Sequence, residues 1–372
     1  MNVTRMSRIL ASGIVPAALS LCAPGAMAQA PFTAPNLSPA EQVVIAIQGR
    51  NASALMESRG THGVGVGLLA DGKTLGLLLF VDRRMPATSL PTQVEGVPVR
   101  VVHSDGFVKH DGPCDQGVPC HAGTYPKPVP MGVSTGNING DFAGTLGFRV
   151  HRLGDPSQVG YVTANHVAAA DSNLCPAQLK PAALAAFNVN QCQPGIFDSP
   201  TGTCALARRI GKLLQVVPLI MGTQFPNVVD AAFVVSKRGC VSKSIRDLGP
   251  PTATAAFPVI GDVVHLSGRT SGRLTNKVMA INAIVDVDYG GACGTARFVG
   301  QAIAEPIDSD AASRPGDSGA PVVSATLNGT PLGLNFAGDG FVSVMTPMPM
   351  VLNALGVQID TAPDTAVPAS CL

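Results

Sequence analysis

The chain has 372 residues, of which 46% are hydrophobic and only 13% are charged, so it can bury a core and is not a disordered chain. The chain has 25 Lys and Arg residues and 24 Asp and Glu residues. This near balance excludes the surplus of basic charge that a nucleic-acid-binding surface requires. With 41 glycines, 31 prolines and 4% aromatic residues, the composition favours a turn-rich β protein over a helical bundle.

The N-terminus has the pattern of a signal peptide. Two arginines precede an apolar run over residues 9–21, and Ala26-Met27-Ala28 forms a small-residue cleavage site. The apolar run is too short to span a membrane. We therefore expect residues 1–28 to be removed and the mature chain to be secreted or periplasmic, without a membrane span.

The mature chain would keep eight cysteines, and an even number of cysteines in an exported chain predicts disulfides. Cys114 and Cys120 are so close in sequence that their pairing is the best single expectation, whereas the other pairings stay open. A zinc site of Cys114, Cys120 and His121 is the alternative, but its spacing fits no common zinc pattern. We expect no metal and no other cofactor.

Residues 29–110 have the pattern of a small α/β domain. Ser38-Pro39-Ala40-Glu41 predicts a helix start with a capping box, and the helix should run to about Glu57 with Val43, Val44, Ile47, Leu55 and Met56 in the core. Apolar runs at 64–70 and 75–81 flank the turn signal Asp71-Gly72, and a third run covers 97–102. Such a unit could be a pro-region or a module that docks a substrate or partner.

Three glycines stand at alternate positions in the first of these strands. Gly63, Gly65 and Gly67 lack the spacing of a dinucleotide-binding motif. We interpret them as glycines of an edge strand.

A Gly-, Pro-, His- and Cys-rich linker is predicted over residues 111–131, followed by a large β unit over 132–358 and a tail over 359–372. Many short apolar runs separated by turn residues predict an all-β unit, either a sandwich or paired barrels. A helix at 351–355 would close this unit. The expected strands lie at 144–150, 160–163, 228–235, 259–266, 278–287, 321–323 and 332–336.

Three local sequences of this β unit carry chemistry. A histidine follows a β run in Tyr161-Val162-Thr163-Ala164-Asn165-His166-Val167. An acidic residue precedes another β run in Asn227-Val228-Val229-Asp230. In Pro315-Gly316-Asp317-Ser318-Gly319, a serine stands between glycines in a tight loop. Asp230 competes for the acidic role with Asp171, Asp198 and Asp262, and is preferred because an apolar strand follows it.

These residue types suit nucleophilic catalysis. A serine hydroxyl needs an imidazole to take its proton, and a carboxylate must orient the imidazole and stabilise its charged form. We expect Ser318 as nucleophile, His166 as general base and Asp230 as its orienting group. The backbone N–H groups of Gly316 and Ser318 would form the oxyanion hole.

Thr163-Ala164-Asn165-His166 and Gly316-Asp317-Ser318-Gly319 resemble the histidine and serine motifs of chymotrypsin-like serine proteases, and the chain order of the three catalytic candidates is that family's order. Ser267-Gly268-Arg269-Thr270-Ser271-Gly272 resembles the streptogrisin-like bacterial members. The resemblance implies a mainly β, chymotrypsin-like double β-barrel protease domain behind the small α/β domain. Barrel one would reach about residue 248 and barrel two about residue 355, with the triad between them.

The family resemblance also bears on substrate and activation. It implies a polypeptide substrate and a pocket near Ala312, Ser313, Phe336, Ala337 and Gly338, where no acid stands to select Lys or Arg, so small or medium apolar side chains are expected. It further implies that Asp317 is buried and pairs with a positive group, often a freed N-terminus. Arg314 is the alternative partner.

Other functions fit the motifs less well. No histidine follows Ser318, which argues against an α/β-hydrolase or a GDSL-type esterase. The prediction is an exported serine endopeptidase. The alternatives are a catalytically silent, protease-like envelope-binding module, or an esterase or acyltransferase that uses the same triad.

Overall fold

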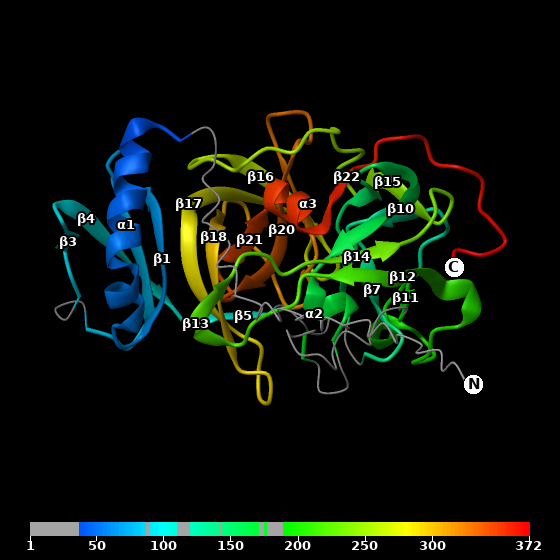
Figure 1. The fold of residues 1–372 in the computed structure, drawn as a ribbon, viewed down its shortest axis with the longest axis horizontal. Coiled ribbons are helices and arrows are strands. Elements are labelled where there is room, and N and C mark those ends of the chain that lie inside the picture. Colours follow the sequence, from blue (N-terminus) through cyan, green and yellow to red (C-terminus); the bar gives the residue numbers. More distant parts are fainter. Residues whose placement is uncertain (1–36, 87–89, 110–119, 141–142, 171–174, 177–188) are drawn as a thin grey trace, which may run out of the picture. The chain divides into compact units, whose positions relative to one another are not determined.

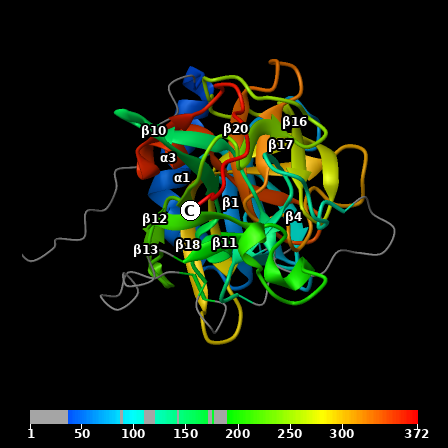
Figure 2. The ribbon, with the colours of Figure 1, turned by 90° about the vertical axis from the view of Figure 1, so that its right-hand side faces the viewer.

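The structure is a computed structural model, and its described residues belong to one unit (Figures 1 and 2). Its described residues contain no helix that is both long enough and apolar enough to cross a membrane. The predicted signal peptide and Cys114 lie outside these residues. The described residues are 37–86, 90–109, 120–140, 143–170, 175–176 and 189–372.

Helix α1 (Pro39–Glu57) begins as predicted. The Ser38 hydroxyl accepts from the backbone N–H of Glu41 at 3.3 Å, and the Glu41 carboxylate accepts from the backbone N–H of Ser38 at 2.7 Å. This capping box satisfies two N–H groups that a helix start otherwise leaves without partners. The predicted core residues of the helix are buried, except Val43, which is 59% exposed. The inclusion of Val43 was wrong because the adjacent Val44 takes the inward position on the helix.

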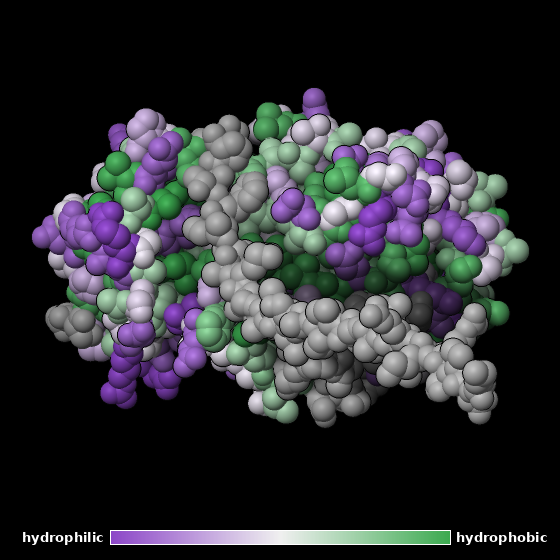
Figure 3. Space-filling model, in the orientation of Figure 1, coloured by the Kyte–Doolittle hydropathy of each residue, from purple (hydrophilic) through white to green (hydrophobic). Residues whose placement is uncertain are grey.

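The α/β part contains a hairpin and a parallel strand. β1 and β2 pair in antiparallel fashion around the predicted turn, and β4 runs parallel to β2. The surface of this part, at the left of Figure 3, is largely hydrophilic. Its strands are β1 (Thr61–Leu68), β2 (Leu75–Asp82), β3 (Gln93–Val94) and β4 (Val97–Ser104).

The first β-barrel closes through six antiparallel chain segments in the described residues. β8 and β9 belong to one segment, because Leu146 N–H donates to Val133 O on one side and Gly147 N–H donates to Val162 O on the other. The ring order is β7, β8/β9, β10, β14, β12, β11 and back to β7. The strands are β7 (Ser134–Asn137), β8 (Gly144–Thr145), β9 (Arg149–Arg152), β10 (Asp155–Thr163), β11 (Asn190–Cys192), β12 (Arg209–Val216) and β14 (Ala232–Val235).

The second β-barrel closes in the same way. Its ring order is β16, β17, β18, β21, β20, β19 and back to β16, all antiparallel. If the strands of each barrel are numbered one to six in chain order, both rings have the order one, two, three, six, five, four. The sequence nevertheless has no visible internal repeat. The strands are β16 (Val263–Gly268), β17 (Gly272–Asp288), β18 (Thr295–Pro306), β19 (Pro321–Ser324), β20 (Pro331–Gly338) and β21 (Ser343–Pro347).

The predicted fold class, a double β-barrel behind a small α/β unit, is confirmed by these two closed rings. Some segments cross between them: β13 pairs in parallel with β18, and β22 returns to β9. The end of the predicted linker forms β6, parallel to β15. The remaining elements are β5 (Phe107–Lys109), β6 (Val129–Met131), α2 (Asn165–Ala168), η3 (Ile196–Asp198), η4 (Leu206–Arg208), β13 (Gly222–Asn227), β15 (Val241–Ile245), α3 (Met348–Leu355) and β22 (Val357–Ile359).

The interpretation of the alternate glycines as edge-strand residues was wrong. β1 is an inner strand that pairs with β2 on one side and with β17 of the second barrel on the other. A Cβ at Gly67 would lie 2.2 Å from the carbonyl oxygen of Met279, and one at Gly63 would lie 3.0 Å from that of Ile284. Glycine is needed here because the backbones approach more closely than a side chain allows.

Three disulfides join described residues: Cys175–Cys293, Cys192–Cys204 and Cys240–Cys371. Both ring nitrogens of His121 form hydrogen bonds with residues that do not belong to the predicted zinc site. Nδ1 lies 2.9 Å from Gly132 O, and Nε2 lies 2.9 Å from the carboxylate of Asp247. The zinc alternative therefore has no free nitrogen at His121.

The C-terminal tail is attached to the first barrel. The fully buried guanidinium of Arg149 contacts Asp360 at 3.2 Å and Asp364 at 2.5 Å, and Cys371 is bound to Cys240. Burial lowers the pKa of Arg149, and the two carboxylates oppose that effect. A buried cation needs such partners to remain charged.

We predict that Gly67→Ala lowers the free energy of unfolding by about 1–3 kcal/mol, because the added methyl group would collide with the backbone of Met279. Gly49→Ala is the matched control: it lies within α1 with nothing within 4 Å of an added Cβ, and should be neutral or stabilise by about 0.5–1 kcal/mol. Urea unfolding of both variants measures the difference. Equal midpoints would contradict the close β1–β17 contact.

Candidate active site

His166 stands where a barrel strand ends. β10 finishes at Thr163, and the one-turn helix α2 begins at Asn165, so the turn presents the imidazole at the end of the first barrel. The side chain is fully buried, and its Nδ1 lies 2.7 Å from Oδ2 of Asp230, which is also fully buried. The structure thus brings together two of the three residues that the sequence predicts for catalysis.

Asp230 precedes β14 and receives three hydrogen bonds. Its Oδ1 accepts from the backbone N–H of Asn165 at 2.6 Å, and its Oδ2 accepts from His166 Nδ1 and from the Tyr289 hydroxyl at 2.6 Å. Burial alone would raise the pKa of Asp230, but the interaction with His166 and the three hydrogen bonds outweigh it, so the pKa is lowered. The carboxylate is therefore ionised at neutral pH.

This arrangement decides the tautomer of His166. Since an ionised carboxylate only accepts hydrogen bonds, the neutral imidazole must carry its proton on Nδ1 and its lone pair on Nε2. Nε2 is buried and has no hydrogen-bond partner in the described part of the chain. An unprotonated nitrogen of this kind is what a general base needs.

Ser318 lies in the loop between β18 and β19, which contacts the first barrel. Its carbonyl oxygen accepts from the backbone N–H of Thr145 in β8 at 2.8 Å. A Cβ at Gly144 would lie 2.4 Å from Val167, the neighbour of His166, and 2.8 Å from Ser318 O. The Ser318 hydroxyl donates to Phe336 O at 3.0 Å, so it does not donate to His166 in this arrangement.

The shape of the serine loop depends on its two glycines. Gly316 has φ +101° and Gly319 has φ +87°, values that favour glycine. A Cβ at Gly316 would lie 2.2 Å from Thr270 Oγ1, and one at Gly319 would lie 2.2 Å from Thr163 Oγ1. The role of the Gly316 and Ser318 N–H groups as an oxyanion hole stays a prediction.

Asp317 is buried, as the resemblance implies, but its partners are neutral donors. Its carboxylate accepts from the N–H groups of Thr270 at 2.9 Å, Ser271 at 3.0 Å and Arg314 at 2.9 Å, and from the Ser271 hydroxyl at 2.5 Å. Burial raises the pKa of Asp317, and these hydrogen bonds offset only part of the effect. The expectation that Arg314 supplies a positive group needs correction, because Arg314 contacts Asp317 through its main chain while its guanidinium binds Asp310.

The described aspartates that compete with Asp230 serve other contacts. Asp198 pairs with the buried guanidinium of Arg269 and accepts from the Ser134 hydroxyl, and Asp262 accepts from the backbone of Val259. Asp171 lies outside the described residues.

Two residues near the candidate site were missed by the sequence analysis. Tyr289 stands in the β17–β18 turn, and its only sequence signal is a position beside two glycines and near Cys293. The Thr145 hydroxyl donates to Gly316 O at 2.9 Å and accepts from Arg269 N–H at 3.0 Å. A threonine in a short strand carries no sequence signal for such a contact.

The predicted pocket residues fall in two places. Ala312 and Ser313 lie in the loop before Ser318, and Phe336, Ala337 and Gly338 form the end of β20; all are buried. The Phe336 ring packs against Phe298 with centroids 4.8 Å apart. Their role in specificity stays a prediction.

Strand β5 covers this end of β20. Lys109 is opposite Ala337 and Val108 is opposite Gly338, in antiparallel register. Because β5 is the last strand of the predicted α/β domain, a segment from outside the predicted protease unit lies along the strand whose Phe336 carbonyl binds the Ser318 hydroxyl.

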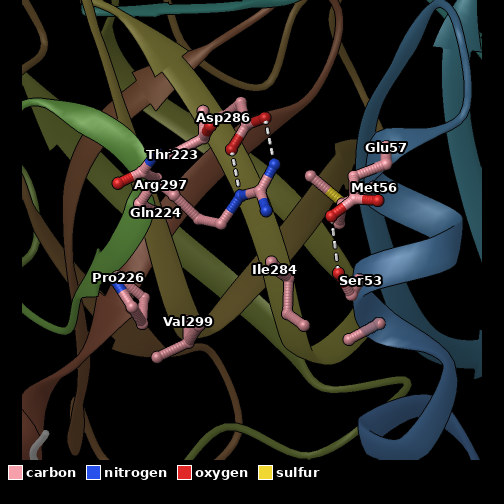
Figure 4. Close-up of a pocket in the computed structure, with 11 residues that line it drawn as sticks. Ser53, Met56, Glu57, Thr223, Gln224, Pro226, Ile284, Asp286, Arg297 and Val299 are labelled. Carbon is pink, nitrogen blue, oxygen red and sulfur yellow. Dashed lines mark hydrogen bonds and ion pairs between the residues drawn. The ribbon is translucent and has the colours of Figure 1, made fainter.

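A separate groove of about 520 Å³ lies between α1, β13 and the β17–β18 sheet (Figure 4). Asp286 and Arg297 face each other in it, joined by two hydrogen bonds of 2.7 and 2.8 Å. None of the candidate catalytic residues lines this groove. Its charged pair is satisfied internally and carries no reactive chemistry.

No family model matches the chain, and no curated protein matches it. Among solved structures, it is similar to Thermobifida fusca protease A, with 21% identity, a TM-score of 0.41, and coverage of 63% of this chain and 99% of that one. It is also similar to a glutamic acid-specific serine protease, with 21% identity, a TM-score of 0.40, and coverage of 62% and 100%. Nocardiopsis protease gives 19% identity, a TM-score of 0.40, and coverage of 63% and 99%.

These three similar structures are named as proteases, one of them as a glutamic acid-specific serine protease. Identities of 21% or less and TM-scores of 0.41 or less do not transfer an activity. The chemistry of this chain has to follow from its own residues.

We predict that Asp230→Asn destabilises the fold in a pH-dependent way. Because the folded-state pKa of Asp230 is lowered, its ionised form stabilises the fold above the unfolded-state pKa of about 4, and this contribution is lost as the pH falls through the folded-state value. The difference from the native chain in free energy of unfolding should therefore be largest near neutral pH and shrink in acid. Urea titrations across the pH range measure it, with Asp262→Asn as a surface carboxylate control. A difference that does not change with pH would contradict the charged Asp230.

Proposed function

We propose that this protein is an exported serine endopeptidase that works through an acyl-enzyme. The observation that carries the proposal is the buried Asp230–His166 pair, whose Nε2 has no hydrogen-bond partner among the described residues, together with the contact of the Ser318 loop with the first barrel. The three disulfides and the predicted signal peptide support export.

In the proposed reaction, the Ser318 hydroxyl turns from Phe336 O to His166 Nε2, which takes its proton as Oγ attacks the carbonyl carbon of the peptide bond. The imidazolium that forms is stabilised by Asp230. His166 then gives the proton to the leaving amine, and the C–N bond breaks to leave an acyl group on Ser318. Water, deprotonated by His166, releases the acid product and restores the serine.

The serine loop would supply the electrostatic part of catalysis. Gly316 and Ser318 N–H groups in the glycine-dependent loop would donate to the oxyanion, and each such donor is worth about 2.7–4 kcal/mol of barrier. Asp317 supports the proposal by accepting from the backbone of Thr270 and Ser271, which holds the loop against the β16–β17 turn. No cofactor takes part in the proposed steps.

One observation favours the alternative of a silent or latent protein. The Ser318 hydroxyl donates to a main-chain carbonyl instead of to His166. In a latent enzyme, activation would redirect this hydroxyl to His166 Nε2, whereas a silent module would keep it on Phe336 O. An esterase or acyltransferase would use the same Asp230–His166–Ser318 arrangement on a different acyl donor.

We predict that a fluorophosphonate probe labels the native chain at Ser318 and that Ser318→Ala abolishes the labelling, because only an activated serine reacts with it. Ser343→Ala, which changes a buried serine of β21, is the matched control and should label as the native chain does. Mass spectrometry of the labelled peptide identifies the site. Labelling with cleavage of a peptide library supports the endopeptidase, and labelling with turnover of simple esters alone supports the esterase.

We further propose that the α/β part acts as a pro-region that occupies the substrate site. A peptide substrate commonly adds to a sheet edge as an antiparallel strand. β5 holds that position on β20 at Ala337 and Gly338, beside the carbonyl that binds the Ser318 hydroxyl. A substrate strand would have to displace β5 from this edge.

We predict that Val108→Pro increases the rate of fluorophosphonate labelling several-fold, because proline removes a backbone N–H and does not suit a paired strand. Val108→Ala keeps the N–H and should label at the native rate. Equal rates for both variants would argue against β5 as an inhibitory strand. So would fully active enzyme from culture whose N-terminus still lies at Gln29.

A further inference from the structure

Tyr289 reaches from the second barrel into the His166–Asp230 pair. It is the first residue after β17, in the turn to β18, and only 1% of it is exposed. Its hydroxyl donates to Asp230 Oδ2 at 2.6 Å, and its ring meets the His166 imidazole edge to face, with centroids 5.7 Å apart and planes at 75°. One side chain therefore contacts both members of the pair.

We propose that Tyr289 is a positioning residue, whose hydroxyl fixes the Asp230 carboxylate so that it orients His166 for catalysis. This inference rests on the proposed function, since it assigns a role within the same site.

The hydrogen bonds around Asp230 show why a third donor matters. Oδ1 is held by one backbone N–H, that of Asn165, which is the residue before His166. Oδ2 receives both His166 Nδ1 and the Tyr289 hydroxyl, which use its two acceptor positions. Without Tyr289, the two donors that remain among the described residues both come from α2, on the first-barrel side of the carboxylate.

The phenol is suited to this role because it stays protonated. Burial and the neighbouring charge of Asp230 raise the pKa of Tyr289 well above its ordinary value. The hydroxyl is thus a neutral donor at neutral pH. Among the described residues, the titratable groups that act on Asp230 are His166 and Tyr289.

A disulfide fixes the turn that carries Tyr289. Cys293, in the same turn, is bound to Cys175, in the segment that follows α2. Tyr289 N–H also donates to Gly294 O at 3.0 Å, which closes the turn. The covalent bond therefore ties the donor of the second barrel to the chain segment that carries His166.

Packing alone does not explain a tyrosine at this position. Its ring belongs to a buried aromatic row, with Phe298 at 6.3 Å and Phe336 beyond it. A phenylalanine would fill the same space, so the hydroxyl is the feature that distinguishes Tyr289 from its neighbours. A buried hydroxyl without a partner would be costly, and the Asp230 carboxylate is the partner here.

The test compares Tyr289→Phe with Tyr161→Phe in the full mature chain. Tyr161 is a fully buried tyrosine of β10, whose hydroxyl contacts Thr135 Oγ1 at 3.2 Å, so the control loses the same atom away from Asp230. Tyr289→Phe should lower kcat/KM about tenfold through kcat, with KM nearly unchanged. Thermal unfolding of both variants shows that the folds are intact.

The pH dependence separates positioning from a structural role. Loss of a donor leaves more negative charge on Asp230, which favours protonated His166, so the acidic limb of the kcat/KM profile should move up by about half a pH unit. Tyr161→Phe should leave that limb in place. In both variants, the ¹H NMR resonance of the His166 Nδ1–H proton reports the same contact without turnover, and it should shift only in Tyr289→Phe.

Two outcomes are decisive. If Tyr289→Phe matches Tyr161→Phe in the pH limb and in the Nδ1–H resonance, the positioning role is overturned. If neither the native chain nor Val108→Pro cleaves peptides or labels at Ser318, the proposed function fails instead. A shift of the resonance in Tyr289→Phe would then still establish that Tyr289 orients the His166–Asp230 pair.

Discussion

The buried carboxylate of Asp230 is the constraint on which the meeting of the two barrels depends. An ionised group without solvent must be surrounded by donors, and Asp230 finds them on two sides. The backbone and imidazole of α2 come from the first barrel, and the hydroxyl of Tyr289 comes from the second. Separating the barrels would leave a buried charge with fewer hydrogen-bond donors, which would cost free energy. The stability of this one carboxylate therefore depends on elements more than 50 residues apart in the sequence.

A second set of contacts docks the serine loop on the first barrel through main-chain atoms. Thr145 is central, because its N–H donates to Ser318 O and its hydroxyl donates to Gly316 O. The glycines allow this close approach, since a Cβ on either would collide with a hydroxyl. Asp317 holds the other side of the loop through the backbone of Thr270 and Ser271. The position of Ser318 thus depends on several hydrogen bonds instead of one ion pair.

The α/β part is integrated with the second barrel and not merely attached to it. β1 extends the barrel sheet at β17, and the alternate glycines allow the two backbones to approach. β5 then adds to β17 and to β20, next to the serine loop. At the other end of the chain, Arg149 and the Cys240–Cys371 bond hold the tail on the first barrel. Both ends of the described chain therefore contribute to the barrels.

Features with local causes could be predicted from the sequence. The capping box at Ser38 and the hairpin at Asp71-Gly72 depend on residues a few positions apart, and both form as expected. The motifs around His166, Asp230 and Ser318 also indicated the candidate site, because their residue types and order are themselves the signal. Strands β12 and β18 were not expected, since charged and small residues interrupt their apolar runs.

The tertiary structure alone decided the contacts between distant segments. Tyr289 and Thr145 act at positions where their own neighbours in sequence give no hint of a partner. The inner position of β1, the partner of Asp317 and the pairing of Cys175 with Cys293 likewise arise only when separate elements meet. The sequence by itself determined the residue types that the chemistry needs and the local turns that present them. Which donor meets which acceptor was decided by the packing of the two barrels, because hydrogen bonds depend on distances that no sequence spacing encodes.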